Sequence, residues 1–136
     1  MRVFLDTGVF LNILNKESGY KSSVKLLEKI QDKKVEGFLS VITFAEMFSI
    51  YYRISKEKTN SAKNFVQSIT GEENIVPVIR SIAELAGKIK AEYKVSLGDA
   101  LIISTSIKIG CDYLVSFDPE IKNVGLVKVR EPSELA

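Results

Sequence analysis

Histidine and tryptophan are absent from this chain of 136 residues, and it contains a single cysteine, Cys111. Without histidine the chain can form no Ser-His-Asp or Cys-His catalytic group, no His-ligated zinc site and no imidazole general base. One cysteine excludes an internal disulfide and a multi-thiolate metal site, which fits a reducing compartment. Any catalysis must therefore depend on carboxylates, hydroxyls, lysines or a hard metal ion.

Long apolar segments are also missing. No run approaches the roughly 20 apolar residues that a bilayer-spanning helix needs, and Asp6 interrupts the N-terminal segment too early for a signal-peptide core. The balance of 46% apolar and 26% charged residues is typical of a globular chain rather than a disordered one. We therefore expect one compact domain, residues 1–136, in a soluble cytoplasmic protein that has no membrane partner.

Short apolar runs alternate with amphipathic segments along the chain. The runs that we interpret as strands are Val3–Leu5, Gly37–Val41, Asn74–Val78, Tyr113–Phe117 and Gly125–Val129. Apolar residues between these runs recur at helical spacing and predict helices over about 7–14, 24–30, 43–51, 57–69, 82–93 and 99–109. The alternation predicts an α/β domain with a mainly parallel central sheet, and no repeat or low-complexity linker interrupts it.

Five aspartates are present, and three of them lie where a strand is expected to end or a helix to begin. Asp6 follows the first strand, Asp118 follows the fourth, and Asp99 opens a helix. Ligand sites in parallel α/β sheets form beyond the carboxyl ends of the strands, so these carboxylates are expected near one edge of the sheet. Glu46, one turn into the helix after Gly37–Val41, could reach the same edge.

Each acid also has an ordinary structural interpretation, which taken singly is the commoner one. Asp6, Asp99 and Asp118 stand at helix starts, where a carboxylate caps free backbone N–H groups. Glu46 discriminates between the two interpretations, because it borders the apolar face of its helix, where an uncompensated charge is costly. Four converging acids raise each other's pKa values unless a cation offsets them. Oxygen ligands without histidine or cysteine indicate Mg²⁺ or Mn²⁺.

Two hydroxyl residues stand close to these acids in the sequence. Thr7 follows Asp6, and Ser116 precedes Asp118 by two residues. Both could orient a metal ligand or a water molecule, although capping and strand packing are commoner roles for such residues. A carboxylate-bound Mg²⁺ polarises a phosphoryl oxygen and lowers the pKa of a bound water, so the pattern favours hydrolysis of a phosphate ester.

The segments that carry these residues are VFLDTG (3–8), SVITFAE (40–46), LGDALII (97–103) and YLVSFD (113–118). In this order and spacing they resemble the signature blocks of PIN domains, and most closely those of VapC-type ribonuclease toxins from prokaryotic toxin–antitoxin pairs. The resemblance covers essentially the whole chain. It implies a three-layer α/β/α sandwich and an Mg²⁺- or Mn²⁺-dependent endoribonuclease, which hydrolyses RNA phosphodiesters with a metal-activated water.

The resemblance carries the family's acidic quartet, which binds the metal and serves catalysis, onto Asp6, Glu46, Asp99 and Asp118. Thr7 matches the hydroxyl residue that commonly follows the first acid. Two positions depart from the pattern, because Gly8 stands where many relatives have Asn or Ser, and Pro119 follows the fourth acid. The implied partners are an RNA substrate, a VapB-like antitoxin whose C-terminal segment reaches the site, and a second copy of the chain in a homodimer.

Outside the quartet, 19 basic residues face 13 acidic ones (17 − 4). Lysine-rich stretches at 53–63 and 88–94 could hold RNA phosphates, and solvated helix faces are an equally good interpretation. Tyr51 and Tyr52 could stack on a base or belong to the core or a dimer interface. Two other functions stay open: an RNA-processing or quality-control nuclease without an antitoxin, and a catalytically degenerate module that binds RNA or protein.

Overall fold

The computed structural model describes residues 1–136 and contains a five-stranded parallel sheet in the order β3-β2-β1-β4-β5. The strands are β1 (Arg2–Leu5), β2 (Glu36–Ser40), β3 (Ile75–Val76), β4 (Tyr113–Val115) and β5 (Val129–Arg130). The helices are α1 (Thr7–Leu14), α2 (Tyr20–Gln31), α3 (Ile42–Tyr51), α4 (Lys56–Gln67), α5 (Arg80–Glu92), α6 (Leu97–Ile109), α7 (Pro119–Val124) and α8 (Pro132–Leu135), with a 3₁₀ turn, η1 (Glu72–Asn74), before β3. No helix is long and apolar enough to cross a membrane.

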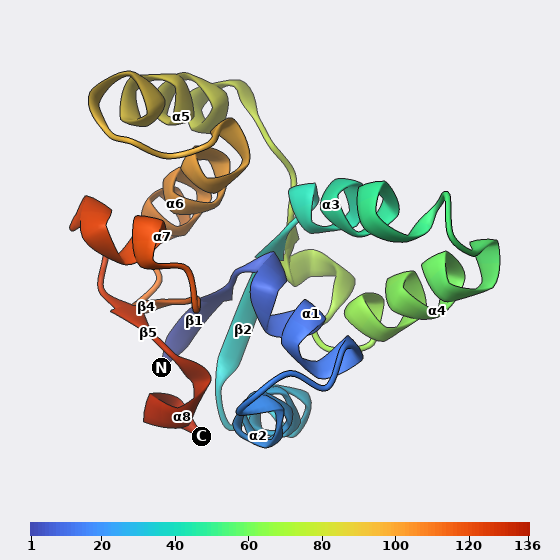
Figure 1. Cartoon of the computed structure of the whole chain (residues 1–136). Coiled ribbons are helices and arrows are strands. Elements are labelled where there is room, and N and C mark those ends of the chain that lie inside the picture. The colour runs from blue at the N-terminus through green and yellow to red at the C-terminus, as the bar shows by residue number, and fades with distance from the viewer.

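Side chains of the central strands alternate between two apolar layers, one on each face of the sheet. Val3 and Leu5 of β1 pack with residues of α1, α2 and α4, whereas Phe4 between them packs with residues of α5 and α6. Figure 1 shows α5, α6 and α7 on one side of the sheet and α1, α2 and α4 on the other. A parallel sheet buried on both faces needs helices on both, and the predicted three-layer α/β/α architecture is confirmed.

The predicted boundaries are wrong for the third and fifth strands. The last strand was expected over Gly125–Val129, but β5 comprises only Val129–Arg130. Gly125 instead ends α7 with a φ of +73°, a left-handed conformation that favours glycine. The expected strand Asn74–Val78 is reduced to Ile75–Val76, since Asn74 ends the 3₁₀ turn and Pro77 has no N–H for the ladder.

The central strand β1 and its neighbour β4 determine where the candidate site forms. β1 lies between β2 and β4, and β4 pairs with it from Val3↔Tyr113 to Leu5↔Val115. One residue beyond the strand, the Asp6 N–H still donates to the Val115 carbonyl at 3.0 Å. The chain segments that leave β1 and β4 therefore begin side by side at the same edge of the sheet.

Candidate active site

The carboxyl-terminal edge of the sheet brings all four predicted acids to one cavity. Asp6 follows β1 directly, Glu46 lies in the second turn of α3, Asp99 in the first turn of α6, and Asp118 at the N-cap of α7. All four line a cavity of about 580 Å³. Residues far apart in the sequence thus present carboxylates to one hollow, where the strand-end argument predicted them.

Asp6 is the most buried of the four acids, with 8% of its surface exposed. It stands at the N-cap of α1, yet its side chain makes no capping hydrogen bond there, so the capping interpretation is wrong for this residue. Its Oδ2 instead accepts a hydrogen bond of 2.7 Å from the Ser116 hydroxyl. Burial raises the pKa of Asp6 to about 7; the Ser116 hydroxyl opposes this shift, and the charges of Asp99 and Glu46 add to it.

Ser116 connects two of the acidic residues. Its side chain is fully buried, and its oxygen, besides donating to Asp6, accepts the backbone N–H of Asp118 at 3.0 Å. One hydroxyl therefore fixes the carboxylate of the first acid and the backbone of the fourth. This contact gives the predicted supporting role of Ser116 a geometric basis.

Glu46 is held by two buried threonines. The Thr7 hydroxyl donates to Glu46 Oε1 at 2.7 Å and lies 3.0 Å from the Thr43 hydroxyl. The other carboxylate oxygen, Oε2, is 3.6 Å from the position that a Cβ on Gly98 would occupy. The Glu46 carboxylate therefore lies between the chain segment that carries Asp6 and the one that carries Asp99.

Asp99 and Asp118 form a close pair. Burial raises the pKa of Asp99 to about 6, and the charge of Asp118 and a hydrogen bond shared with it add to the shift, while the Ser96 hydroxyl opposes it. Both residues also stand in capping motifs: Ser96 Oγ accepts the Asp99 N–H at 3.1 Å, and Asp118 Oδ1 accepts the Glu120 N–H at 2.9 Å. At Asp118 the carboxylate both caps α7 and lines the cavity, so there the two interpretations of the sequence do not exclude each other.

No basic side chain compensates the charge of this cavity. Its 14 lining residues include no lysine or arginine. The four ion pairs of the molecule all involve acids outside the quartet. No three His, Cys, Asp or Glu side chains are arranged to hold a metal ion in this conformation. The cavity is thus strongly acidic, but its carboxylates are not prearranged as a set of three metal ligands.

One wall of the cavity was missed by the sequence-based prediction. It is formed by the end of α1 and the loop that follows, with Asn12, Asn15, Glu17 and Ser18. Asn12 is buried; its amide donates to the Ser18 carbonyl at 3.1 Å and its Oδ1 accepts the hydroxyl of Ser23 at 2.7 Å. The signal was present, because Asn12 and Asn15 share one face of a helix with Gly8.

Gly8, Pro119 and Tyr51 all lie at or beside the cavity. Gly8 lines the cavity, and a Cβ there would meet Asp6 Oδ2 at 3.7 Å, an ordinary contact, so the missing side chain leaves open space. Pro119 occupies the first turn of α7, directly after Asp118. Tyr51 is buried, and its hydroxyl donates to Asn15 at 3.2 Å. Of the two tyrosines considered for stacking on a base, Tyr52 is therefore the exposed one.

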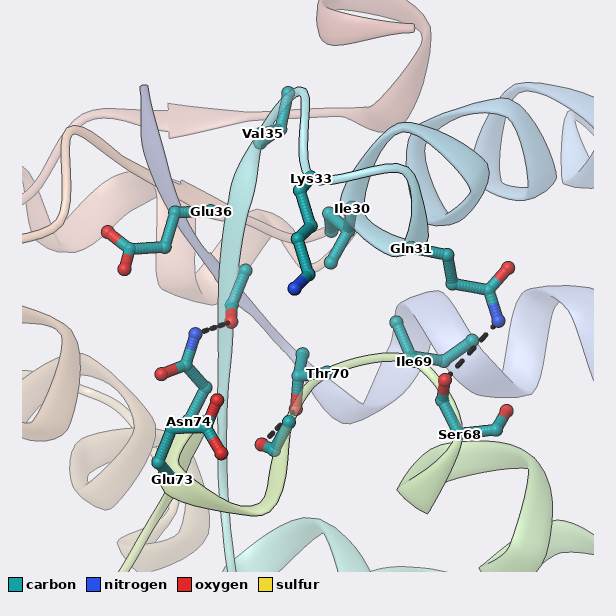
Figure 2. A pocket seen from close by; sticks show the side chains of 12 residues that line it. Ile30, Gln31, Lys33, Val35, Glu36, Ser68, Ile69, Thr70, Glu73 and Asn74 are labelled. Carbon is teal, nitrogen blue, oxygen red and sulfur yellow. Dashed lines mark hydrogen bonds between the residues drawn. The ribbon is translucent and has the colours of Figure 1, made fainter.

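A second cavity, of about 630 Å³, lies at the opposite end of β2. Figure 2 shows it between the end of α2 and the loop before β3, where Asn74 donates to the Gly37 carbonyl and Gln31 to the Ser68 carbonyl. None of the four acids lies in it. Although slightly larger, this cavity is separate from the predicted chemistry.

Comparison with known proteins assigns the family. The family model that describes the PIN domain matches residues 3–126. The chain belongs to the PIN-domain family. This PIN domain is 25% identical over 142 aligned residues to Ribonuclease VapC2 from Methanocaldococcus jannaschii, an alignment that covers 96% of this chain and 93% of that protein. The predicted family resemblance is confirmed.

Solved structures share the PIN-domain fold. A chain of VapBC2 from Rickettsia felis, crystallised with a DNA fragment from the promoter, matches with a TM-score of 0.77 at 20% identity, covering 96% of this chain and 98% of that one. VapC20 from Mycobacterium tuberculosis, a Sarcin-Ricin loop cleaving toxin, matches with a TM-score of 0.72 at 18% identity, covering 94% and 98%. At these identities the agreement concerns the fold.

Proposed function

We propose that this PIN domain is a metal-dependent endoribonuclease and the toxin of a toxin–antitoxin pair. It would hydrolyse RNA phosphodiesters in the cavity lined by Asp6, Glu46, Asp99 and Asp118. The observation that carries the proposal is the convergence of these carboxylates without a basic neighbour. Membership of the PIN family and the likeness to a protein named as a ribonuclease support the same conclusion.

The donor set fits a hard divalent cation such as Mg²⁺ or Mn²⁺. Every candidate ligand is a carboxylate, and the pKa values of Asp6 and Asp99 are raised to about 7 and about 6, which an adjacent cation would reverse. Mg²⁺ is commonly bound by one or two carboxylates, with waters and substrate phosphate completing its shell. A preformed group of three acids is therefore not required. Asp6 and Asp99 would hold the cation, with Glu46 and Asp118 beside them.

A bound cation would polarise the phosphodiester and lower the pKa of a water molecule. The chain itself supplies orientation for this chemistry. Ser116 keeps Asp6 Oδ2 in place, and Thr7 keeps Glu46 Oε1 in place, so the remaining oxygens are free for ligands. The wall formed by Asn12, Asn15 and Ser18 borders the space in which the scissile nucleotide would lie.

The ribonuclease activity is tested with purified protein and end-labelled RNA and DNA of the same sequence. We expect cleavage of the RNA in Mg²⁺ or Mn²⁺, little cleavage of the DNA, and none of either strand in excess EDTA. RNA cleavage that persists in EDTA would contradict the metal dependence. Intact RNA under every condition would favour the catalytically degenerate binding module.

The toxin assignment adds two partners to the proposal, a VapB-like antitoxin and a second copy of the chain. The antitoxin is supported by the fold likeness to VapBC complexes. The homodimer is supported by exposed apolar side chains on and just after α3, where Phe48, Tyr52 and Ile54 are 39%, 50% and 71% exposed. Measurement of the mass in solution by sedimentation, for the wild type and Phe48→Glu, tests the dimer.

Expression in bacterial cells tests the toxin role. We expect growth arrest, and relief of the arrest by co-expression of the product of a short reading frame that abuts or overlaps this gene. Unaffected growth and an isolated gene would favour an RNA-processing or quality-control nuclease without an antitoxin.

A further inference from the structure

Thr43 is a fully buried residue near the cavity that has not been assigned a role. It is the second residue of α3, three positions before Glu46, so both side chains lie on the same face of that helix. Its hydroxyl has one hydrogen-bond partner, the Thr7 hydroxyl at 3.0 Å. It does not line the cavity itself.

A buried hydroxyl at position 43 is costly compared with an apolar side chain of the same size. Burying a hydroxyl costs free energy unless it is hydrogen-bonded, and valine would fill the same volume without that requirement. Two other buried threonines bond to the carbonyl four positions before them, as Thr59 does to Ser55 and Thr105 to Leu101. Thr43 instead bonds across to α1, directly beside the first acid.

The protons of the two hydroxyls can be assigned by counting. An ionised Glu46 only accepts, and each threonine has one proton to donate. The contact of 2.7 Å to Glu46 Oε1 uses the Thr7 proton, so the 3.0 Å contact must use the Thr43 proton. The chain of donation therefore runs from Thr43 to Thr7 to Glu46, and bonds in such a chain strengthen one another.

We propose that Thr43 is a positioning residue, which acts through Thr7 to hold the Glu46 carboxylate with Oε1 bound and Oε2 free toward the cavity. Thr43 does not touch the ligand itself. The inference rests on the proposed function, because it assigns the free oxygen of Glu46 to the cation. It goes further in naming a residue outside the cavity on which that assignment depends.

Two substitutions at this position separate positioning from packing. Thr43→Val keeps the shape and removes the donor, whereas Thr43→Ser keeps the donor and removes a methyl group. Thr105→Val is the matched control, because it makes the same change at another fully buried threonine, whose hydroxyl bonds only to the Leu101 carbonyl. All three proteins are compared with the wild type for thermal unfolding.

The first measurement uses Mn²⁺ alone as the probe. We expect Thr43→Val to bind Mn²⁺ about three- to tenfold more weakly, at or below the low end of the roughly 10–100-fold effect of groups that orient a metal ligand. Thr43→Ser should bind as the wild type does, and so should Thr105→Val. Equal Mn²⁺ affinity in Thr43→Val and the wild type would overturn the positioning role.

The second measurement needs no metal and keeps the proposal separate from the proposed function. In crystals of metal-free Thr43→Val we expect the Glu46 carboxylate to leave its single position against Thr7, and in Thr43→Ser to keep it. An unchanged Glu46 in Thr43→Val overturns the inference. If the wild type neither binds Mn²⁺ nor cleaves RNA, the proposed function fails, and this comparison still decides whether Thr43 positions Glu46.

Discussion

At the scale of single residues, Asp6 combines deep burial with a strongly raised pKa. Its pKa rises from 3.8 to about 7 because burial disfavours the charged form, and the nearby carboxylates act in the same direction. In the absence of a cation, ionisation of Asp6 in the folded state therefore costs free energy, and the full cost is reached only above about pH 7. The residue is suited to binding and unsuited to stability, as functional residues often are.

The pH dependence of this cost has a definite sign. A carboxyl whose pKa is raised on folding favours the folded state below pH 3.8, and that contribution is lost as the pH rises through about 7. Asn at this position carries no charge at any pH. With EDTA present, we expect Asp6→Asn to be more stable than the wild type at pH 8, and the difference to shrink at pH 5.

The size of this effect has an upper limit. A change in pKa from 3.8 to about 7 corresponds to at most about 4 kcal/mol, at about 1.4 kcal/mol per pKa unit. Urea unfolding at the two pH values measures the difference, and Asp32→Asn, at an exposed position, controls for the loss of one negative charge. A variant less stable than the wild type at pH 8 would contradict this description of Asp6.

Ser116 gives a second prediction at the same scale. Ser116→Ala removes the donor to Asp6 and leaves the Asp118 N–H without its acceptor. An unpaired buried group costs about 1–3 kcal/mol; the Asp6 carboxylate is buried and the Asp118 N–H partly buried, so we expect a clear loss of stability together with slower RNA cleavage. Urea unfolding and single-turnover cleavage measure both effects. Full stability and full activity in Ser116→Ala would show that neither contact matters.

At the scale of structural elements, the loop between α1 and α2 forms the wall that the sequence-based prediction missed. Asn12 braces this loop from inside by bonding to the Ser18 carbonyl and to the Ser23 hydroxyl. We expect Asn12→Ala to speed hydrogen exchange over residues 15–19 and to leave the strands unchanged. Exchange measured by mass spectrometry tests this, with Asn60→Ala on the exposed face of α4 as the control. Unchanged exchange in the loop would contradict it.

How well each element could be predicted depended on whether its signal was local. Val3–Leu5, an apolar run ended by Asp6, predicted β1 and its neighbouring acid, because a buried parallel strand reads as continuous apolar sequence. The last strand could not be placed by the same reasoning. Its two residues pair with β4 only because Gly125 and the segment after it return the chain to the edge of the sheet.

The site shows the same division between local and long-range signals. The four acids could be found because strand ends and helix starts mark them in the sequence. Thr43 could not, since its significance lies in a contact with Thr7, 36 positions away. Asn12 and Asn15 were overlooked in an otherwise apolar helix, although their spacing with Gly8 was visible. Contacts between distant segments are what the sequence alone does not supply.

At the scale of the whole molecule, an acidic cavity lies in a chain whose total charge is +2. A divalent cation that binds only the folded state stabilises it by mass action. We expect 5 mM Mn²⁺ to raise the Tm of the wild type and to leave the Tm of an Asp6→Asn/Asp99→Asn double variant unchanged. Differential scanning calorimetry at low salt measures both. An equal rise in the two proteins would place the cation elsewhere.

The central claim is that the carboxylates of this cavity cleave RNA together with a metal ion. The most direct measurement is the initial rate of RNA cleavage as a function of Mn²⁺ concentration, for the wild type, Asp6→Asn and Asp99→Asn. We predict a rate that rises and saturates with Mn²⁺ in the wild type and falls by at least about 100-fold in each variant, while both variants stay folded. Equal rates in all three proteins would contradict the account.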